Sequence, residues 1–336
     1  MYGTRWAGRC DGRLDVATLY KQDQRGSNAE CGRTPCIHAI VVSWRPDALQ
    51  LRRQFVALLA QVDQLVWVDN GSGQDLPERA GALADPRVHL IALAENGGLA
   101  YAQNRGIEWA RAHGATHVLL MDQDSLPQAG MVAALLRALE QAAARNERVA
   151  AVGPVCRDAK THATYPLISR TGWRIKRVPP ERLRAPFPVA YLPASGCLIP
   201  VSALAAIGPM RTEYFIDRID MEWCLRARRL GYLVLVVPGV EMQHDLGQHD
   251  VHVCGRRLYL GADWRAYFHV RNSLAMALRA RIPLFWRVDQ LLKLPAYMLL
   301  YLVRARCGRW RMTARLGRAV GHGLLDRMGP AGQAPD

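Results

Sequence analysis

Four clusters of polar residues in this chain have types and spacings that could do chemistry. The first is Asp122-Gln123-Asp124, directly after the apolar run 117–121. Two carboxylates two residues apart at a strand end can share a hard divalent cation, because Mg²⁺ and Mn²⁺ favour oxygen ligands and often bridge to substrate phosphates. An ordinary polar turn uses the same residues, so this spacing alone leaves both interpretations open.

The second cluster places three acids within six residues, at Asp217, Asp220 and Glu222, where a helical segment begins. Acids are common at helix N-termini because they offset the positive end of the helix dipole. A carboxylate there could also serve as a general base that removes a proton from an acceptor hydroxyl. Both roles fit the pattern.

The remaining clusters are a histidine and a glycine-rich segment. His244 lies just past the last predicted core strand, a position where a single histidine is more often structural than a metal ligand. Residues 95–106 read ENGGLAYAQNRG, with Gly97 and Gly98 just before a helical pattern. Glycines at such a point let backbone N–H groups approach a phosphate or a base closely.

Alternating strands and helices must position these clusters. Apolar, β-branched runs predict strands over 37–43, 65–72, 88–92, 117–121, 149–155 and 233–237. Apolar residues at helical spacing predict helices over 47–60, 101–113 and 131–145, and another helix after the acidic turn within 214–231. This alternation indicates an α/β fold with a mainly parallel sheet, whose ligands lie at the carboxyl ends of the strands. Ser43, Asp69 and Asp122 stand at those ends, and the basic segment 156–188 is expected to be an irregular loop on the acceptor side.

In this order the clusters resemble the family 2 glycosyltransferases, which bind nucleotide sugars with a GT-A fold. The resemblance covers roughly residues 37–272, through the segments VDNGS (68–72), NGG (96–98), NRG (104–106), MDQDS (121–125), DMEW (220–223), His244 and YFHVRN (267–272). The segment FIDRIDMEWCLR (215–226) looks most like bacterial rhamnosyltransferases of cell-surface polysaccharide assembly. Related galactofuranosyltransferases share much of this pattern.

The resemblance implies a Rossmann-like, mainly parallel central sheet flanked by helices, over residues 36–272. Residues 1–35 are expected to form a poorly ordered extension, and residues 273–336 a helical, basic, amphipathic tail. The resemblance also implies a nucleotide-sugar pocket, in which Asp69 would bind the pyrimidine and Asp122 would lie near the ribose. The full pocket would comprise Ser43, Asp69, Asn96, Gly97, Gly98, Asn104, Asp122 and Gln123.

Catalysis is implied by the same resemblance. Asp124 and His244 would ligate Mg²⁺ or Mn²⁺, and Asp220 would be the general base. The acceptor would be bound by Asp217, Glu222 and Trp223. Many relatives carry Glu-Asp where this chain has Ile219-Asp220, so Asp217 stays open as an alternative base.

The reaction implied is a single displacement that inverts the anomeric carbon. Asp220 would deprotonate an acceptor hydroxyl, which attacks opposite the departing nucleoside diphosphate. The resemblance implies dTDP-L-rhamnose as donor and a lipid-linked or polysaccharide acceptor; the alternative is a galactofuranosyl or other hexosyl transfer from a UDP-sugar.

Other classes of protein fit the sequence less well. Haloacid-dehalogenase-like phosphatases also carry Asp-x-Asp after a strand, but usually near the start of the domain and followed by Thr or Val, where this chain has Leu126. The net charge of +15 suggests nucleic acid, yet the basic tail shows no aromatic-interleaved sheet motif or zinc module, so no nucleic-acid partner is expected. A dinucleotide-binding dehydrogenase lacks its glycine motif after the first strand.

The tail points to a membrane surface. Between Arg271 and Arg327 it carries twelve Arg or Lys and two Asp, around the ten apolar residues 294–303. Ten residues are too few to span a bilayer, which needs about 20. We expect either a helical hairpin packed on the catalytic domain or a shallow helix on anionic lipid. With scattered cysteines and no apolar secretory segment at the start, we expect a cytoplasmic protein, peripheral on the inner face of the cytoplasmic membrane.

Overall fold

Strands of one sheet carry most of the predicted site residues. The computed structural model describes residues 34–73, 85–158, 163–244, 249–253 and 256–330. The chain divides into two units, Met1–Thr34 and Pro35–Asp336, and the description below concerns the second. The extension expected over residues 1–35 lies almost wholly outside the described residues.

Within the described residues the sheet has the strand order β3-β2-β1-β4-β10-β6-β11-β5, with β9 beside β11. The first four strands, β1 (Ile37–Ser43), β2 (Gln64–Asp69), β3 (Val88–Ala92) and β4 (His117–Asp122), are parallel to their neighbours. The antiparallel strand β10 (Cys197–Pro200) separates β4 from β6 (Val149–Asp158). The last strands of this sheet are β5 (Ser125–Pro127), β9 (Phe187–Pro188) and β11 (Leu233–His244).

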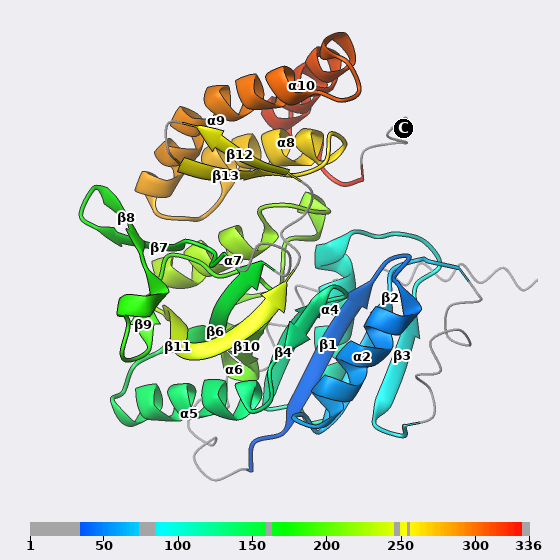
Figure 1. The fold of residues 1–336 in the computed structure, drawn as a ribbon, viewed down its shortest axis with the longest axis vertical. Helices are drawn as coiled ribbons and strands as arrows, with labels where there is room; N and C mark the ends of the chain where they lie inside the picture. Colours follow the sequence, from blue (N-terminus) through cyan, green and yellow to red (C-terminus); the bar gives the residue numbers. More distant parts are fainter. Residues whose placement is uncertain (1–33, 74–84, 159–162, 245–248, 254–255, 331–336) are drawn as a thin grey trace, which may run out of the picture. The chain divides into compact units, whose positions relative to one another are not determined.

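Alternation of side chains along β1 explains why helices cover both faces of this sheet. Ile40 and Val42 lie in a hydrophobic cluster with α4 (Leu99–Ala112), α6 (Val201–Ile207) and α7 (Ile219–Arg229). Ala39 and Val41 lie in a second cluster with α2 (Ala48–Leu59) and α5 (Met131–Ala144). Successive residues of a strand point to opposite faces, so a strand that is apolar throughout is buried on both sides. Figure 1 shows α2 in front of the sheet and α4 behind it. The predicted α/β architecture is confirmed.

The segment predicted to be an irregular loop contains regular structure, so that prediction is wrong. Strand β6 runs on to Asp158, and β7 (Leu167–Thr171) and β8 (Arg174–Val178) form an antiparallel hairpin, followed by the short helix η2 (Pro180–Arg182). A two-residue turn joins the hairpin strands, with Gly172 at a φ of 57°. Glycine suits such a turn because it has no Cβ. Basic residues on the exposed positions hide the alternation that would have predicted these strands.

Three helices follow the sheet and the small hairpin formed by β12 (His249–Val253) and β13 (Arg256–Leu260). They are α8 (Arg265–Arg279), α9 (Leu284–Arg304) and α10 (Arg309–Leu324), and they share a hydrophobic cluster. The predicted boundary between residues 272 and 273 falls inside α8, because this helix continues without a break. None of the described helices combines the length and the apolar character needed to cross a bilayer.

Candidate active site

The carboxyl ends of three neighbouring strands meet at one edge of the sheet. Parallel pairing aligns Ser43 of β1 with Asp69 of β2, and Val42 of β1 with Asp122 of β4. The sheet therefore brings three of the predicted nucleotide-binding residues, Ser43, Asp69 and Asp122, to one place. Ligands bind at this edge in open α/β sheets.

Asp69 is buried and holds the turn that follows β2. Its carboxylate accepts hydrogen bonds from the Ser72 hydroxyl at 2.5 Å and from the Ser72 backbone N–H at 3.0 Å. Ser43 Oγ donates to the same carboxylate at 3.4 Å and accepts from Trp67 Nε1 at 2.8 Å. These hydrogen bonds fix the Asp69 carboxylate in place. A carboxylate that recognises a nucleobase needs to be held in this way.

Asn70 connects this turn to the glycine segment Asn96–Gly98. Its amide donates to Asn96 Oδ1 and its oxygen accepts from the Gly97 N–H, both at 3.0 Å. Asn96 Oδ1 also accepts from the Gly98 N–H at 3.0 Å. The predictions from sequence omitted Asn70, although it lies inside the VDNGS segment next to Asp69. These hydrogen bonds tie the glycine segment to the turn that follows β2.

The turn carrying Asp122, Gln123 and Asp124 is held by residues from other elements. Gln54 of α2 donates to the carbonyls of Asp122 and Ser125, both at 2.6 Å. The Asp122 N–H donates to Ser195 Oγ at 3.0 Å, and Gln123 Oε1 accepts from the Trp44 N–H at 2.7 Å. Gln123 therefore joins this turn to the end of β1.

His244 ends strand β11, where the antiparallel register pairs it with Ser125. This pairing places its backbone one residue from Asp124; its side chain lies outside the part of the structure that is described.

The donor set at the end of β4 suits a hard divalent cation, since Asp122 and Asp124 supply carboxylate oxygens. Among the described residues, no three His, Cys, Asp or Glu side chains gather so that they could hold a metal together. Mg²⁺ commonly uses one or two protein carboxylates and completes its shell with water and substrate phosphates. Asp122 and Asp124 fit that kind of site.

The acids Asp217 and Asp220 lie near each other but have different surroundings. Asp217 forms an ion pair with Arg265 of α8, with 2.5 Å between Nη2 and Oδ1. Asp220 is in the first turn of α7 and accepts from the Met221 N–H at 2.8 Å. Burial raises the pKa of Asp220, although the hydrogen bond from Met221 and the charge of Arg218 oppose the rise. A carboxylate with a raised pKa is a better proton acceptor, as a general base must be.

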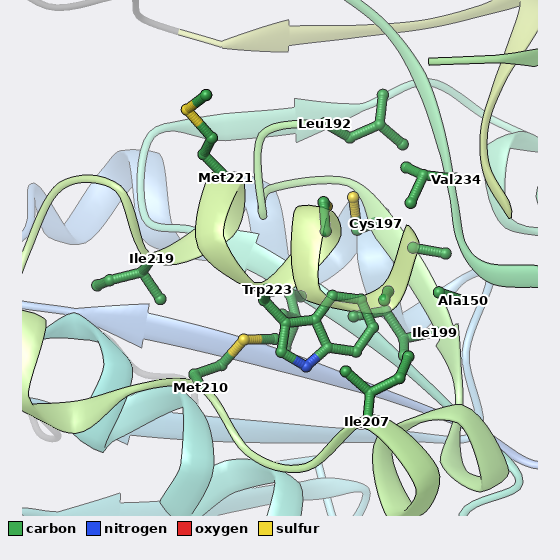
Figure 2. Packing of buried hydrophobic residues seen from close by; sticks show 14 of the residues in the cluster. Ala150, Leu192, Cys197, Ile199, Ile207, Met210, Ile219, Met221, Trp223 and Val234 are labelled. Carbon is green, nitrogen blue, oxygen red and sulfur yellow. The ribbon is translucent and has the colours of Figure 1, made fainter. Parts of the chain in front are cut away.

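Glu222 and Trp223 are core residues, and their burial contradicts the predicted contact with an acceptor. Glu222 is 0% exposed and pairs with Arg226 at 3.1 Å and with Arg211 at 3.3 Å. Trp223 is 1% exposed and donates from Nε1 to the Gly208 carbonyl at 2.9 Å. Figure 2 shows its indole ring beside Ile207. Positions 219, 222, 223 and 226 share one side of a helix, and this side of α7 faces inward.

Asn104 is buried as well, and its amide is bonded to the backbone. Its Nδ2 donates to the Met210 carbonyl at 2.8 Å, and its Oδ1 accepts from the Met210 N–H at 3.0 Å. Arg226 donates to the carbonyls of Ile207 and Pro209 at 2.6 and 2.7 Å. Asn104, Glu222 and Trp223 therefore position the chain that leads to Asp217 and Asp220, and the predicted nucleotide contact of Asn104 does not fit these bonds.

The glycine segment touches the loop Phe215–Arg218, which we call the base loop because it leads into Asp220. The Leu99 N–H donates to the Phe215 carbonyl at 2.6 Å. A Cβ added at Gly98 would lie 2.6 Å from Cδ2 of Phe215, so only glycine allows this approach. The segment predicted to bind the donor and the loop next to the predicted base are thus in direct contact.

Known proteins of similar sequence point to one family. The sequence model of the family described as "Glycosyl transferase family 2" matches residues 40–207. A protein named dTDP-rhamnosyl transferase RfbF, from Shigella flexneri, is 31% identical over 76% of this chain and 84% of its own length. One named N-acetylglucosaminyl-diphospho-decaprenol L-rhamnosyltransferase, from Mycobacterium tuberculosis, is 27% identical over 85% of this chain and 99% of its own length.

Solved structures are similar in fold at low sequence identity. The 1–349 portion of S. aureus TarS in complex with UDP-GlcNAc has a TM-score of 0.56 at 11% identity, covering 86% of this chain and 81% of that one. GalNAc-T7 with UDP, GalNAc and Mn²⁺ has a TM-score of 0.53 at 14% identity, and the match covers 82% of this chain but 58% of that one. Both are similar in fold alone, and that fold is GT-A. This chain is therefore an enzyme of the family 2 glycosyltransferases.

Proposed function

We propose that this enzyme transfers L-rhamnose from dTDP-L-rhamnose to a hydroxyl group of a lipid-linked saccharide. The names of the two relatives support the donor sugar, and the name of the mycobacterial relative supports a lipid-diphosphate acceptor. The observation that carries the proposal is the hydrogen bond between Leu99 and Phe215, which puts the glycine segment beside the base loop. A donor held at the strand edge would thereby lie next to Asp220.

Asp220 is the base in this proposal. Asp217 is committed to its ion pair with Arg265, which lowers its availability for proton transfer. Asp220 would take the proton of the acceptor hydroxyl while the oxygen attacks the anomeric carbon. The nucleoside diphosphate would leave from the opposite face, so the product has inverted configuration. The preorganised strand edge would hold the donor for in-line attack.

A donor screen tests the proposed sugar. Purified enzyme with Mg²⁺ or Mn²⁺ should consume dTDP-L-rhamnose when a saccharide acceptor is present. Turnover of UDP-sugars alone would show that the donor is wrong while leaving the family unaffected. Release of phosphate from simple phosphomonoesters without any sugar transfer would contradict the proposed reaction itself.

The proposed cation site involves Asp122, Asp124 and His244. A divalent cation bound there would offset the charge that develops on the leaving diphosphate. Asp124→Ala should weaken binding of dTDP in the presence of Mn²⁺ and change it little in EDTA, measured by calorimetry. Asp85→Ala is the control, since Asp85 pairs with Arg87 on the surface. Equal losses for Asp124→Ala with and without Mn²⁺ would exclude a role in cation binding.

We also propose that α9 docks on anionic lipid at the cytoplasmic face of the membrane. One side of α9 packs into the protein through Trp286, Gln290, Leu294 and Tyr301. Its other side exposes apolar residues, which we call the α9 stripe: Leu284, Val288, Leu291, Leu292, Leu299 and Val303. Large exposed apolar surfaces on proteins mark sites of interaction with other molecules, and we infer such a site here.

The surroundings of the α9 stripe match an anionic partner. Exposed basic residues accompany it on α9, on α10 and in the turn between them: Lys293, Arg304, Arg306, Arg309, Arg311 and Arg318. Trp173, at the tip of the β7–β8 hairpin, is 75% exposed and contacts Phe285 at the start of α9, with ring centroids 5.6 Å apart. Trp310 on α10 is 83% exposed. Aromatic and basic residues of this kind are typical of helices that lie at a lipid interface.

Vesicle binding tests this surface. The wild-type enzyme should co-float with anionic vesicles at low salt, and binding should weaken as salt rises because the charges are screened. Leu292→Glu with Leu299→Glu should abolish flotation. Leu49→Glu is the matched control, because Leu49 is a 60% exposed leucine on α2. No flotation of the wild type at low salt would contradict the proposed membrane contact.

A further inference from the structure

The base loop has an unusual backbone. Phe215, Asp217 and Arg218 have positive φ angles of 64°, 66° and 67°. Residues with a side chain rarely adopt this region, and such conformations persist only where the surroundings hold them. The loop is followed at once by Ile219 and Asp220. What holds this loop therefore also sets the position of Asp220.

One buried asparagine on α8 binds the backbone of the base loop. Nδ2 of Asn272 lies 2.9 Å from the carbonyl oxygen of Tyr214, 2.7 Å from that of Ile216 and 2.9 Å from that of Asp217. An amide group has two hydrogens, so these three contacts share two donors. Arg271 donates from Nε to Asn272 Oδ1 at 3.0 Å, which orients the amide toward the loop. Both side chains are 0% exposed.

A chain of side chains joins the same loop to α9. Arg218 donates to Ser273 Oγ at 3.0 Å and to Nε2 of His269. The Nδ1 atom of His269 lies 2.8 Å from the hydroxyl of Tyr301 on α9. Arginine has no acceptor, so Nε2 of His269 must be unprotonated, and Nδ1 carries the proton that it donates to Tyr301. Burial and the charges of Arg218 and Arg265 lower the pKa of His269 well below its usual value, which keeps the ring neutral.

We propose that Asn272, His269 and Tyr301 are positioning residues that hold the base loop in its left-handed conformation and so fix Asp220 against the donor. The inference rests on the proposed role of Asp220 and goes beyond it, because Asn272 and His269 contact the base loop and Tyr301 acts on it through His269. It also gives α9 a part in catalysis: its inward face supports the base loop through Tyr301. Since the loop contacts Leu99 as well, its conformation sets the distance between the glycine segment and the base.

The test compares two variants that remove hydrogen bonds made by the helices. Tyr301→Phe removes the hydroxyl beside His269. Arg279→Met is the control: it removes the bonds from Arg279 to the carbonyls of Gly323 and Leu324, which join α8 to α10. Tyr301→Phe should speed amide hydrogen exchange over residues 215–218 and lower kcat by roughly ten- to a hundredfold, with donor KM unchanged. Arg279→Met should lower Tm without either effect.

Two substitutions of His269 give a rescue experiment. His269→Leu removes the acceptor for Arg218 and should reproduce the losses of Tyr301→Phe. His269→Gln offers an amide oxygen to Arg218 and should restore part of the kcat. Equal kcat for the two substitutions would overturn the proposal, as would equal exchange in Tyr301→Phe and Arg279→Met.

The two proposals fail in different ways. Hydrogen exchange is measured without a sugar donor, and kcat is measured with whichever nucleotide sugar the wild type transfers. A wild type that rejects dTDP-L-rhamnose therefore removes the proposed donor only. Unchanged exchange in Tyr301→Phe removes the positioning role only.

Discussion

Asp217 and Asp220 lie three residues apart, yet their neighbours give them different tasks. Arg265 pairs with Asp217, whereas Asp220 lies half-buried in the first turn of α7, where desolvation raises its pKa. A half-buried carboxylate with a raised pKa is suited to accept a proton. These different surroundings support the proposal that Asp220, and not Asp217, is the base.

Asp220→Asn should lower kcat by about 10²–10⁴ while dTDP binding changes little, because the amide keeps the shape but accepts no proton. Single-turnover kinetics and calorimetry would measure both. Asp217→Asn, which breaks the ion pair with Arg265, should act mainly on stability. An active Asp220→Asn beside an inactive Asp217→Asn would reverse the assignment.

The pH dependence of kcat should show the raised pKa of Asp220. The base is inactive when protonated, so kcat rises as pH rises through this pKa. Because burial raises it, the acid limb should lie above the ordinary aspartate value of about 3.9. Arg218 lowers the pKa of Asp220, so Arg218→Gln should move the limb to higher pH. A limb that stays in place would argue that another group is the base.

Glu222 contributes to stability through its two arginine partners. Glu222→Ala leaves Arg226 and Arg211 without their buried carboxylate, and breaking a buried ion pair costs about 3–5 kcal/mol. Chemical denaturation should show a loss of this size, with dTDP binding retained in the folded fraction. A stable Glu222→Ala protein with a raised acceptor KM would restore the acceptor role predicted from sequence.

At the scale of elements, the contact between the glycine segment and the base loop depends on Gly98. Gly98→Ala should be strained by its φ of 89°, and its Cβ should push against Phe215. Gly114→Ala is a matched control, since Gly114 has a φ of 83° and open space around it. A left-handed alanine costs roughly 1–2 kcal/mol, so both variants should lose stability. Only Gly98→Ala should also raise donor KM and lower kcat in steady-state assays.

The strands of the sheet and the helices that cover it could be predicted because their apolar residues recur at regular spacings. The first strand is recovered at 37–43 and the third at 88–92 with their boundaries unchanged. The β7–β8 hairpin could not be predicted in this way, since basic residues occupy its exposed positions. The inward side of α7 was also missed, because Glu222 and Trp223 are polar or amphipathic residues in an acidic segment that resembles a catalytic motif. Contacts such as Asn272 with the base loop join residues more than 50 positions apart, and no local pattern contains them.

At the scale of the whole molecule, His269 makes stability depend on pH. Its pKa is lowered well below 6.5 in the folded protein, so below pH 6.5 the unfolded chain binds more protons. Stability is therefore lost as pH falls from about 6.5, by up to about 1.4 kcal/mol per pH unit from this residue. His38, His89 and His322 also have lowered pKa values and add to the slope.

Comparison of His269→Gln with the wild type isolates the contribution of His269. Denaturation measured at several pH values between 5 and 7.5 should give a shallower decline for the variant. Parallel curves for the two proteins would show that the ring titrates at its ordinary pKa in the folded state, and a steeper decline for the variant would show that the ring is charged there.

Helix α9 presents the α9 stripe on one side and Tyr301 on the other, so the same helix would take part both in lipid binding and in ordering of the base loop. Suppose that lipid binding favours the arrangement of α9 that supports the base loop. Thermodynamic linkage then requires that ordering of the base loop favours lipid binding, with the same coupling free energy. A nucleotide donor that orders the base loop must then raise the affinity of the enzyme for anionic vesicles by the same factor. Each substrate would then promote binding of the other, because a donor in the aqueous phase would favour residence of the enzyme at the surface that would hold the proposed lipid-linked acceptor.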